Sequence, residues 1–176
     1  MKNDYPMIET KRLILRKWKS QDFEPFYKIN SHQKVCQYLP KILTESESNE
    51  FANKIIQKFD TQGFGLFALE IKDRGQFIGY TGLYIPDFDA PFMPTIEIGW
   101  RLAFDHWGQG FATEAALAVR DYAFEELKLP EIVSFTVPEN TASRRVMEKI
   151  GMVYDPDADF SHPDFLNDQV LSPYVL

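Results

Sequence analysis

The sequence predicts an α+β fold, in which about four helices flank a central, mostly antiparallel, twisted sheet of about six to seven strands. Two observations support this prediction. Residues 64–85 have the pattern of an antiparallel hairpin, and residues 95–114 pass from a strand through a glycine-rich loop into a helix. A chain of 176 residues suits one domain that buries about two thirds of its unfolded surface. We therefore expect a single domain over residues 1–176.

The first part of the chain predicts one strand followed by two helices. Apolar side chains alternate along Lys11–Trp18, as they do in a strand. Asp22 is placed to cap a helix whose first turn contains Pro25, where the missing N–H costs nothing. Thr44-Glu-Ser-Glu47 is a capping box that opens a second helix. The apolar face of that helix recurs every four residues, at Phe51, Ile55 and Phe59.

The middle of the chain predicts most of the sheet. Phe64–Ile71 and Gln76–Ile85 are rich in aromatic and β-branched residues and flank the turn Lys72-Asp-Arg-Gly75, so they predict two antiparallel strands. Asp87–Pro94 predicts a loop, because prolines recur between Ile85 and Thr95. The strand that follows ends at Leu102.

The last part predicts two more helices and two more strands. A long helix follows the glycine loop and ends before Pro130, and Ile132–Val137 is a strand. Asn140 is the N-cap of a further helix that ends at Gly151. We expect residues 155–168 to form a loop and residues 170–176 to contain a short strand. The buried stripe of the long helix is Ala115, Val119, Tyr122, Ala123 and Leu127.

Trp107-Gly-Gln-Gly-Phe-Ala-Thr-Glu114 combines a glycine loop with a helix start. Gly108 and Gly110 lack the Cβ atoms that would block a close turn, so successive N–H groups can converge on one anion. The first N–H groups of the helix have no partner within it and carry the positive end of its dipole. The segment therefore predicts a phosphate site. It lacks the Lys-Ser or Lys-Thr pair and the third glycine of better-known nucleotide loops, which disfavours a nucleoside triphosphatase and a Rossmann dehydrogenase.

Composition and charge exclude several classes of function. The formal net charge of −7 argues against nucleic acid as a partner. It favours a cationic second substrate or simply a solvated acidic surface. Apolar runs fall short of the roughly 20 residues that span a bilayer, and the N-terminal residues have no signal-peptide pattern, so we expect a cytoplasmic protein without membrane contact. The single cysteine, Cys36, and three scattered histidines predict no disulfide and no metal site.

Four segments of the chain carry a family pattern: Thr10–Arg16, Phe77–Leu83, Glu97–Leu102 with Trp107–Ala115, and Asn140–Gly151. They resemble the GCN5-related N-acetyltransferase (GNAT) superfamily, and within it the ribosomal-protein acetyltransferases and their small-molecule relatives. The set is specific because it spans most of the chain in the family's order. The resemblance implies the GNAT fold, and an enzyme that transfers an acetyl group from acetyl-CoA to a primary amine by direct attack on the thioester. The acceptor would be a protein N-terminus or a small molecule, and a homodimer is compatible with the family.

The resemblance also implies which residues bind the cofactor. The pyrophosphate would bind backbone N–H groups of residues 108–113, and the pantetheine arm would pair with the strand end almost like an added strand. Asn140 would bond the pantetheine amide, and Ser143 would face the phosphate or adenine side. From the residues alone, Asn140 and Ser143 could equally serve as helix caps only. The implied set is Trp100, Arg101, Leu102, Trp107, Gly108, Gln109, Gly110, Phe111, Ala112, Thr113, Asn140 and Ser143.

Two positions depart from the family pattern. Trp107 stands where the glycine motif often has Arg or Gln, and an indole cannot donate as a guanidinium does. Met147 stands where many relatives have a tyrosine that protonates the leaving thiolate, and methionine has no proton to donate. Either Ser143, a water or Tyr154 serves instead, or the thiolate leaves without a dedicated donor. The alternative interpretation is a coenzyme A-binding module that senses or scaffolds without catalysis.

Glu97 is the candidate catalytic base. A primary amine is mostly protonated near neutral pH, so acetyl transfer needs a group that accepts a proton. Glu97 lies between Ile96 and Ile98 in a predicted strand, so its carboxyl should be partly buried and its pKa raised. It could act directly or through a water. The alternative is a structural ion pair with Arg101 on the same face of the strand. His106, beside the glycine loop, is a second candidate base or a solvent-facing turn residue.

Overall fold

The computed structural model describes residues 6–90, 92–165 and 169–176. Pro91 and residues 166–168, which fall in predicted loops, lie outside the described residues, as do residues 1–5. The strands are β1 (Ile8–Glu9), β2 (Leu13–Arg16), β3 (Leu66–Ile71), β4 (Gln76–Tyr84), β5 (Glu97–Leu102), β6 (Val133–Thr136), β7 (Val153–Tyr154), β8 (Phe160–Ser161) and β9 (Val170–Val175). The main helices are α1 (Phe23–Asn30), α2 (Glu45–Gln62), α3 (Phe111–Asp121) and α4 (Thr141–Lys149).

The predicted α+β fold with a mostly antiparallel sheet is confirmed. Within the described residues the strand order is β1-β2-β3-β4-β5-β6-β9-β7, and β8 pairs with β9. The parallel contact is between β5 and β6, where Glu97 lies opposite Val133. The sheet has more strands than predicted because β1, β7 and β8 contain two residues each. A strand this short shows no alternation in the sequence.

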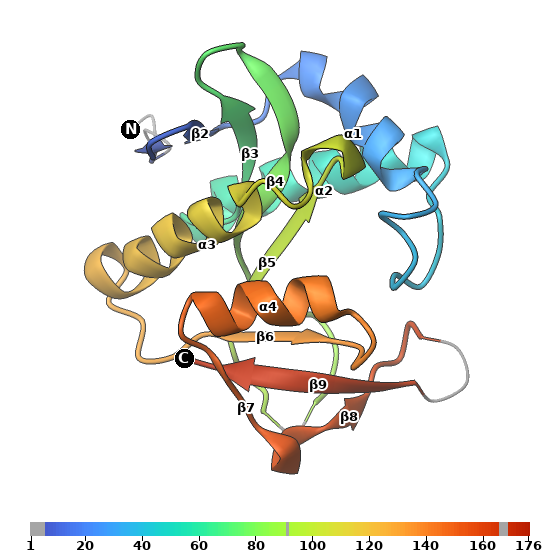
Figure 1. Cartoon of the computed structure of the whole chain (residues 1–176), viewed down its shortest axis with the longest axis vertical. Coiled ribbons are helices and arrows are strands. Elements are labelled where there is room, and N and C mark those ends of the chain that lie inside the picture. The colour runs from blue at the N-terminus through green and yellow to red at the C-terminus, as the bar shows by residue number, and fades with distance from the viewer. Residues whose placement is uncertain (1–5, 91, 166–168) are drawn as a thin grey trace.

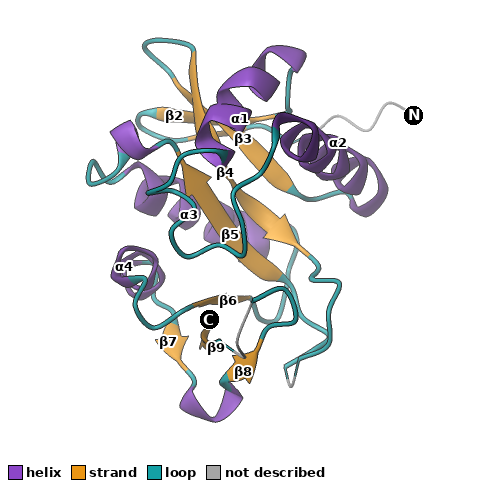
Figure 2. Cartoon of the chain, turned by 90° about the vertical axis from the view of Figure 1, so that its right-hand side faces the viewer, coloured by secondary structure: helices purple, strands orange, loops and turns teal. Residues whose placement is uncertain are grey.

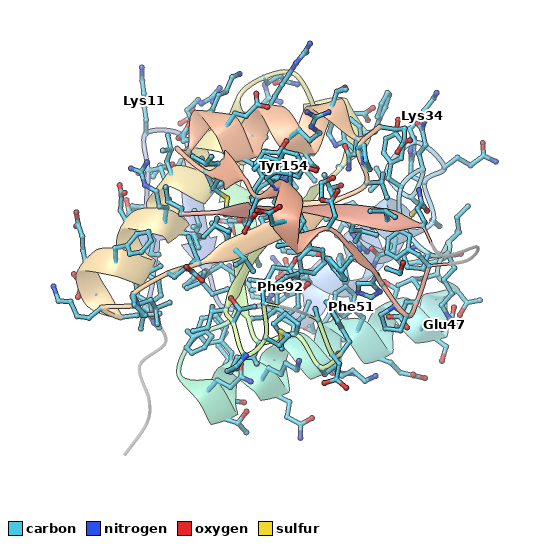
Figure 3. All side chains as sticks on the ribbon, turned by 90° about the horizontal axis from the view of Figure 1, so that it is seen from below. Lys11, Lys34, Glu47, Phe51, Phe92 and Tyr154 are labelled. Carbon is cyan, nitrogen blue, oxygen red and sulfur yellow. The ribbon has the colours of Figure 1, made fainter. Side chains whose placement is uncertain are left out.

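Helices cover both faces of the sheet (Figures 1 and 2). α1 and α2 pack on one face, where Phe26 and Ile55 meet Tyr80 of β4 in an apolar cluster. α3 and α4 pack on the other face, where Val119 and Met147 belong to the largest core cluster. Seen from below, the sheet lies between α4 and α2 (Figure 3). Among the described helices, none has the length and hydropathy of a bilayer-spanning segment.

Most of the predicted helix ends are confirmed. Thr44 Oγ1 accepts from the Glu47 N–H at 3.3 Å, and the Glu47 carboxylate accepts from the Thr44 N–H at 2.8 Å, as a capping box requires. Asn140 caps α4, and Gly151 follows that helix with a φ of 97°. α3 continues into a π-helical turn, Tyr122–Glu126, so the long predicted helix is present with a widened last turn.

The predicted capping role of Asp22 is wrong. Asp22 occupies the N-cap position of α1, but its side chain makes no capping bond. The carboxylate is buried and accepts from the Arg16 guanidinium at 2.8 and 2.9 Å and from the Lys19 N–H at 2.7 Å. A buried guanidinium must be paired, and this requirement outweighs the helix cap. The ion pair joins β2 to the start of α1.

Candidate active site

The glycine loop forms a cradle of backbone N–H groups between β5 and α3. Gly108 and Gly110 have φ angles of 71° and 82°, a conformation that is strained for residues with a Cβ. Gly110 is the N-cap of α3, and no side chain caps the helix there. The Glu114 N–H bonds the Gly110 carbonyl, so the free donors of the first turn belong to the residues between them. The loop therefore fits a phosphate group.

Glu114 ties this loop to the N-terminal strands. Its carboxylate accepts from Thr10 Oγ1 at 2.6 Å, from the Arg12 N–H at 2.7 Å and from Arg12 Nε at 2.7 Å. Arg12 also donates to the Gln109 carbonyl at 2.9 Å, and its guanidinium lies 4.2 Å from the centre of the Phe111 ring. Burial raises the pKa of Glu114, but these hydrogen bonds hold it below its ordinary value. The tie fixes the loop, and no local sequence pattern predicts it, because Thr10 and Arg12 are far from Glu114 in the chain.

Trp107 holds the loop to the end of β5. Its indole N–H donates to the Leu102 carbonyl at 2.9 Å, and its ring lies 5.3 Å from the ring of Phe104. This side chain therefore positions the loop rather than replacing the guanidinium of other glycine motifs. The Leu102 carbonyl keeps one free lone pair for any further donor.

β5 and β6 separate immediately beyond Glu97, as their different directions in Figure 1 show. β5 remains paired with β4 as far as Leu102. In an antiparallel ladder, alternate residues turn their N–H and C=O groups away from the neighbouring strand. The Ala103 N–H donates to the Ile78 carbonyl of β4, so Ala103 turns its main-chain groups toward β4. By the alternation, the N–H and C=O groups of Trp100 turn away from β4, toward the side that β6 has left. Main-chain groups exposed in this way can pair with an extended ligand.

Glu97 is buried at the point where the two strands separate. The residue is 6% exposed, and its Oε2 atom has no hydrogen-bond partner among the described residues. Burial raises the pKa of Glu97 to about 8, although a hydrogen bond with Tyr84 lowers it. A carboxyl with this pKa can exchange a proton near neutral pH. The prediction that this carboxyl is buried with a raised pKa is confirmed.

Arg101 does not pair with Glu97 in the structure. Its Nη1 atom donates to Asn30 Oδ1 at 2.6 Å, and its guanidinium carbon lies 5.7 Å from the ring centres of Phe51 and Tyr80. Phe51 belongs to α2 and is labelled in Figure 3. The alternative role predicted for Glu97, an ion pair with Arg101, is therefore wrong. The Arg101 side chain lies on the face covered by α1 and α2.

α4 follows β6 in the chain, and Asn140 and Ser143 lie at the start of this helix. Asn140 Oδ1 accepts from the Ser143 N–H at 3.2 Å, and Nδ2 donates to Thr136 Oγ1 at 3.0 Å. The capping role is thus present, and one amide proton of Asn140 remains for a ligand. Met147 is buried in the core, so it neither donates a proton nor faces a ligand.

The other candidates lie apart from Glu97. Tyr154 is on β7, separated from β5 by β9 and β6, and donates to the Asp159 carboxylate at 2.9 Å. His106 lines a 430 Å³ pocket with Arg12 and Arg74, and burial lowers its pKa. It is half-buried in the short turn Phe104–His106, and its role as a base or as a turn residue stays a prediction. No cluster of three metal-ligating side chains occurs in the described part of the chain.

Comparisons with known proteins agree with this geometry. A family model described as an acetyltransferase (GNAT) domain matches residues 12–153. The "Uncharacterized N-acetyltransferase YnaD" of Bacillus subtilis is 35% identical over 146 residues, which are 82% of this chain and 81% of the relative. The "Uncharacterized N-acetyltransferase YoaA" of the same organism is 33% identical over 152 residues, or 84% and 82% of the two chains.

Solved structures show the same fold. A GNAT-family acetyltransferase from Bacillus anthracis has a TM-score of 0.80 and 29% identity, and the match covers 97% of this chain and 98% of that one. Spermidine N-acetyltransferase from Vibrio cholerae, in complex with CoA and spermine, has a TM-score of 0.73 and 22% identity, with 94% and 95% coverage. At that identity the likeness concerns the fold alone.

The fold and these relatives define an acetyltransferase that acts on amino groups. The chain belongs to the GNAT family. Enzymes of this family use acetyl-CoA and act on amine acceptors.

Proposed function

We propose that the protein transfers an acetyl group from acetyl-CoA to a primary amine, with Glu97 as the general base. The observation that carries this proposal is the buried Glu97 carboxyl, which has an unpartnered oxygen where β5 and β6 separate. An ammonium group must lose a proton before its nitrogen can attack, and a carboxylate beside the acceptor can take that proton directly or through a water. Acetyl-CoA would supply the acetyl group as an activated thioester.

The residues present fit the binding of coenzyme A. The free N–H groups of residues 108–113 would hold the pyrophosphate, because the loop is a nest at a helix N-terminus. The main-chain groups of Trp100 and Leu102 would pair with the pantetheine arm. The remaining amide proton of Asn140 would donate to a pantetheine carbonyl, with Ser143 nearby. Neither Met147 nor Tyr154 is placed to protonate the thiolate, which leaves Ser143, a water or no dedicated donor.

Several wider features belong to the same proposal. We place the enzyme near the ribosomal-protein acetyltransferases and their small-molecule relatives, a placement supported by motif resemblance and by shared fold. Residues 1–176 would form one acetyltransferase domain in the cytoplasm, without a nucleic-acid or membrane partner and without a metal. A homodimer is consistent with the family.

Turnover tests the proposal. Release of the coenzyme A thiol from acetyl-CoA is followed across amines, amino acids and N-terminal peptides, and the product is identified by mass spectrometry. We expect thiol release that depends on the amine, with a product heavier by one acetyl group. Tight coenzyme A binding with no product from any acceptor would instead indicate a sensor or scaffold module.

A further inference from the structure

Arg101 has a positive charge that no acidic side chain neutralises within the described residues. Its contacts are the Asn30 amide oxygen at 2.6 Å and the rings of Phe51 and Tyr80, both at 5.7 Å. An amide and two rings fix the guanidinium without removing its charge. A guanidinium has five N–H donors, and a single one is used in this set of contacts.

The unused donors of Arg101 are open to a ligand. The buried, unpartnered side-chain atoms of the described residues include Glu97 Oε2 but no atom of Arg101. The residue is half-buried, so its free N–H groups reach solvent. Asn30, which orients the guanidinium, is fully buried and also donates to Ser48 at 2.9 Å. A buried amide thus orients the guanidinium on the protein side.

Arg101 and Glu97 belong to one polar site. They lie on the same face of β5, four residues or about 13 Å of strand apart, with Gly99 between them. Opposite them on β4 are Tyr80 and Tyr84, paired with Arg101 and Glu97 respectively. Burial raises the pKa of Tyr80, and the charges of both Arg101 and Glu97 act on that same hydroxyl. A ligand whose amine meets Glu97 therefore comes under the influence of Arg101.

We propose that Arg101 selects acceptors that carry a carboxylate in addition to the reacting amine, as amino acids do. This inference rests on the proposed function of the site. A fixed guanidinium with free, forked donors matches a carboxylate and forms charge-assisted hydrogen bonds with it. The same charge repels a second ammonium group, so a polyamine is disfavoured. The overall negative charge of the chain, which suggested a cationic substrate, does not describe this site.

Matched acceptors test the proposal. For several amino acids, kcat/KM is compared with that of the carboxamide and of the decarboxylated amine, and spermidine is included as a polyamine. We expect the carboxylate to be preferred over the carboxamide by about tenfold to a hundredfold, mainly through KM, because a hydrogen bond to a charged group contributes about 1.5–3 kcal/mol. Arg101→Gln should abolish the preference, and Arg101→Lys should retain part of it.

Arg120→Gln is the matched control, because it removes a guanidinium that bonds Asp121 and the Ile150 carbonyl on the opposite face. It should keep the wild-type preference. Equal kcat/KM for carboxylate and carboxamide in the wild-type enzyme would overturn the inference, and so would a preference that survives in Arg101→Gln. The wild-type comparison stands even if a variant fails to fold.

Calorimetry separates this inference from the proposed function. Binding of the amino acid and of its carboxamide to the coenzyme A-loaded protein is measured without turnover. If no amine is acetylated but the carboxylate still binds more tightly, the proposed function fails and the role of Arg101 stands. If amines are acetylated without any effect of the carboxylate, the function stands and the role of Arg101 fails. Equal binding without turnover contradicts both.

Discussion

Tyr84 and Glu97 lie directly opposite each other on β4 and β5, and the tyrosine hydroxyl hydrogen-bonds the buried carboxyl. The two effects on this carboxyl are opposed. Burial raises the pKa of Glu97, and the hydrogen bond lowers it, with about 8 as the result. Tyr84 is thus a positioning residue, which acts on the reaction through the base that it contacts.

Tyr84→Phe should move the pH dependence of the reaction to higher pH. Without the hydroxyl, the ionised form of Glu97 loses a donor, so its pKa rises by about one unit, which corresponds to about 1.4 kcal/mol. The pH profile of kcat/KM measures the shift. Tyr122→Phe, on the α3 face, is the control and should leave the profile in place. An unchanged profile in Tyr84→Phe would contradict the role of the hydrogen bond.

The raised pKa of Glu97 should also make the protein less stable at alkaline pH. The folded pKa of about 8 lies above the ordinary 4.5, so folding favours the protonated carboxyl, and stability is lost as pH rises through about 8. Glu97→Gln has no proton to lose. Relative to wild type, its free energy of unfolding should rise by a few kcal/mol between about pH 4 and about pH 9. Urea denaturation at both pH values measures this, and a pH-independent difference would contradict the burial.

Gly110→Ala should weaken acetyl-CoA binding as well as stability. A φ of 82° costs a residue with a Cβ about 1–2 kcal/mol, and the new methyl would lie 3.4 Å from Arg12 Nη2. The loop would shift, and KM for acetyl-CoA should rise by about tenfold. Gly63→Ala is the matched control, since Gly63 has a φ of 77° at the end of α2. It should lower Tm similarly but leave KM unchanged, so equal KM values in the two variants would exclude the phosphate loop.

Glu114→Gln should loosen the glycine loop in a pH-dependent way. The pKa of Glu114 is lowered in the folded protein, so the ionised carboxylate adds stability above its ordinary pKa of 4.5, and this stability is lost as pH falls through the folded value. The variant should lose about 1–2 kcal/mol of unfolding free energy at neutral pH and little in acid. Glu24→Gln, which breaks an exposed pair with Lys28, should change neither stability nor KM for acetyl-CoA.

Local patterns predicted the helix ends, the hairpin and the glycine loop, because capping bonds and positive φ angles involve neighbouring residues. The flanking isoleucines of Glu97 also predicted its burial. Contacts between distant residues were not predictable. The bond between Arg12 and Glu114 joins residues 102 positions apart. The pairing of Tyr84 with Glu97 depends on the β4–β5 register, which the irregular segment between the two strands does not encode in any local pattern.

Arg101 is a second example of a side chain whose partner in the fold could not be predicted from its neighbours in the sequence. Its spacing from Glu97 predicted a shared strand face, and that is correct. The ion pair expected from this spacing is absent because Asn30, at the end of α1, takes the guanidinium instead. Where α1 packs is decided by the apolar cluster beneath it, not by the charges on β5.

The pH dependence of Glu97→Gln tests the central claim most directly. The acceptor should be an amine whose own pKa lies well above the range measured, so that it stays an ammonium group throughout and the profile reports the ionisation of the enzyme alone. For the wild type, kcat/KM should rise as pH approaches about 8 and then level off. In Glu97→Gln, kcat/KM should fall by about 10²–10⁴-fold, and the rising limb should disappear. A variant that keeps both the rate and the limb would show that Glu97 is not the base.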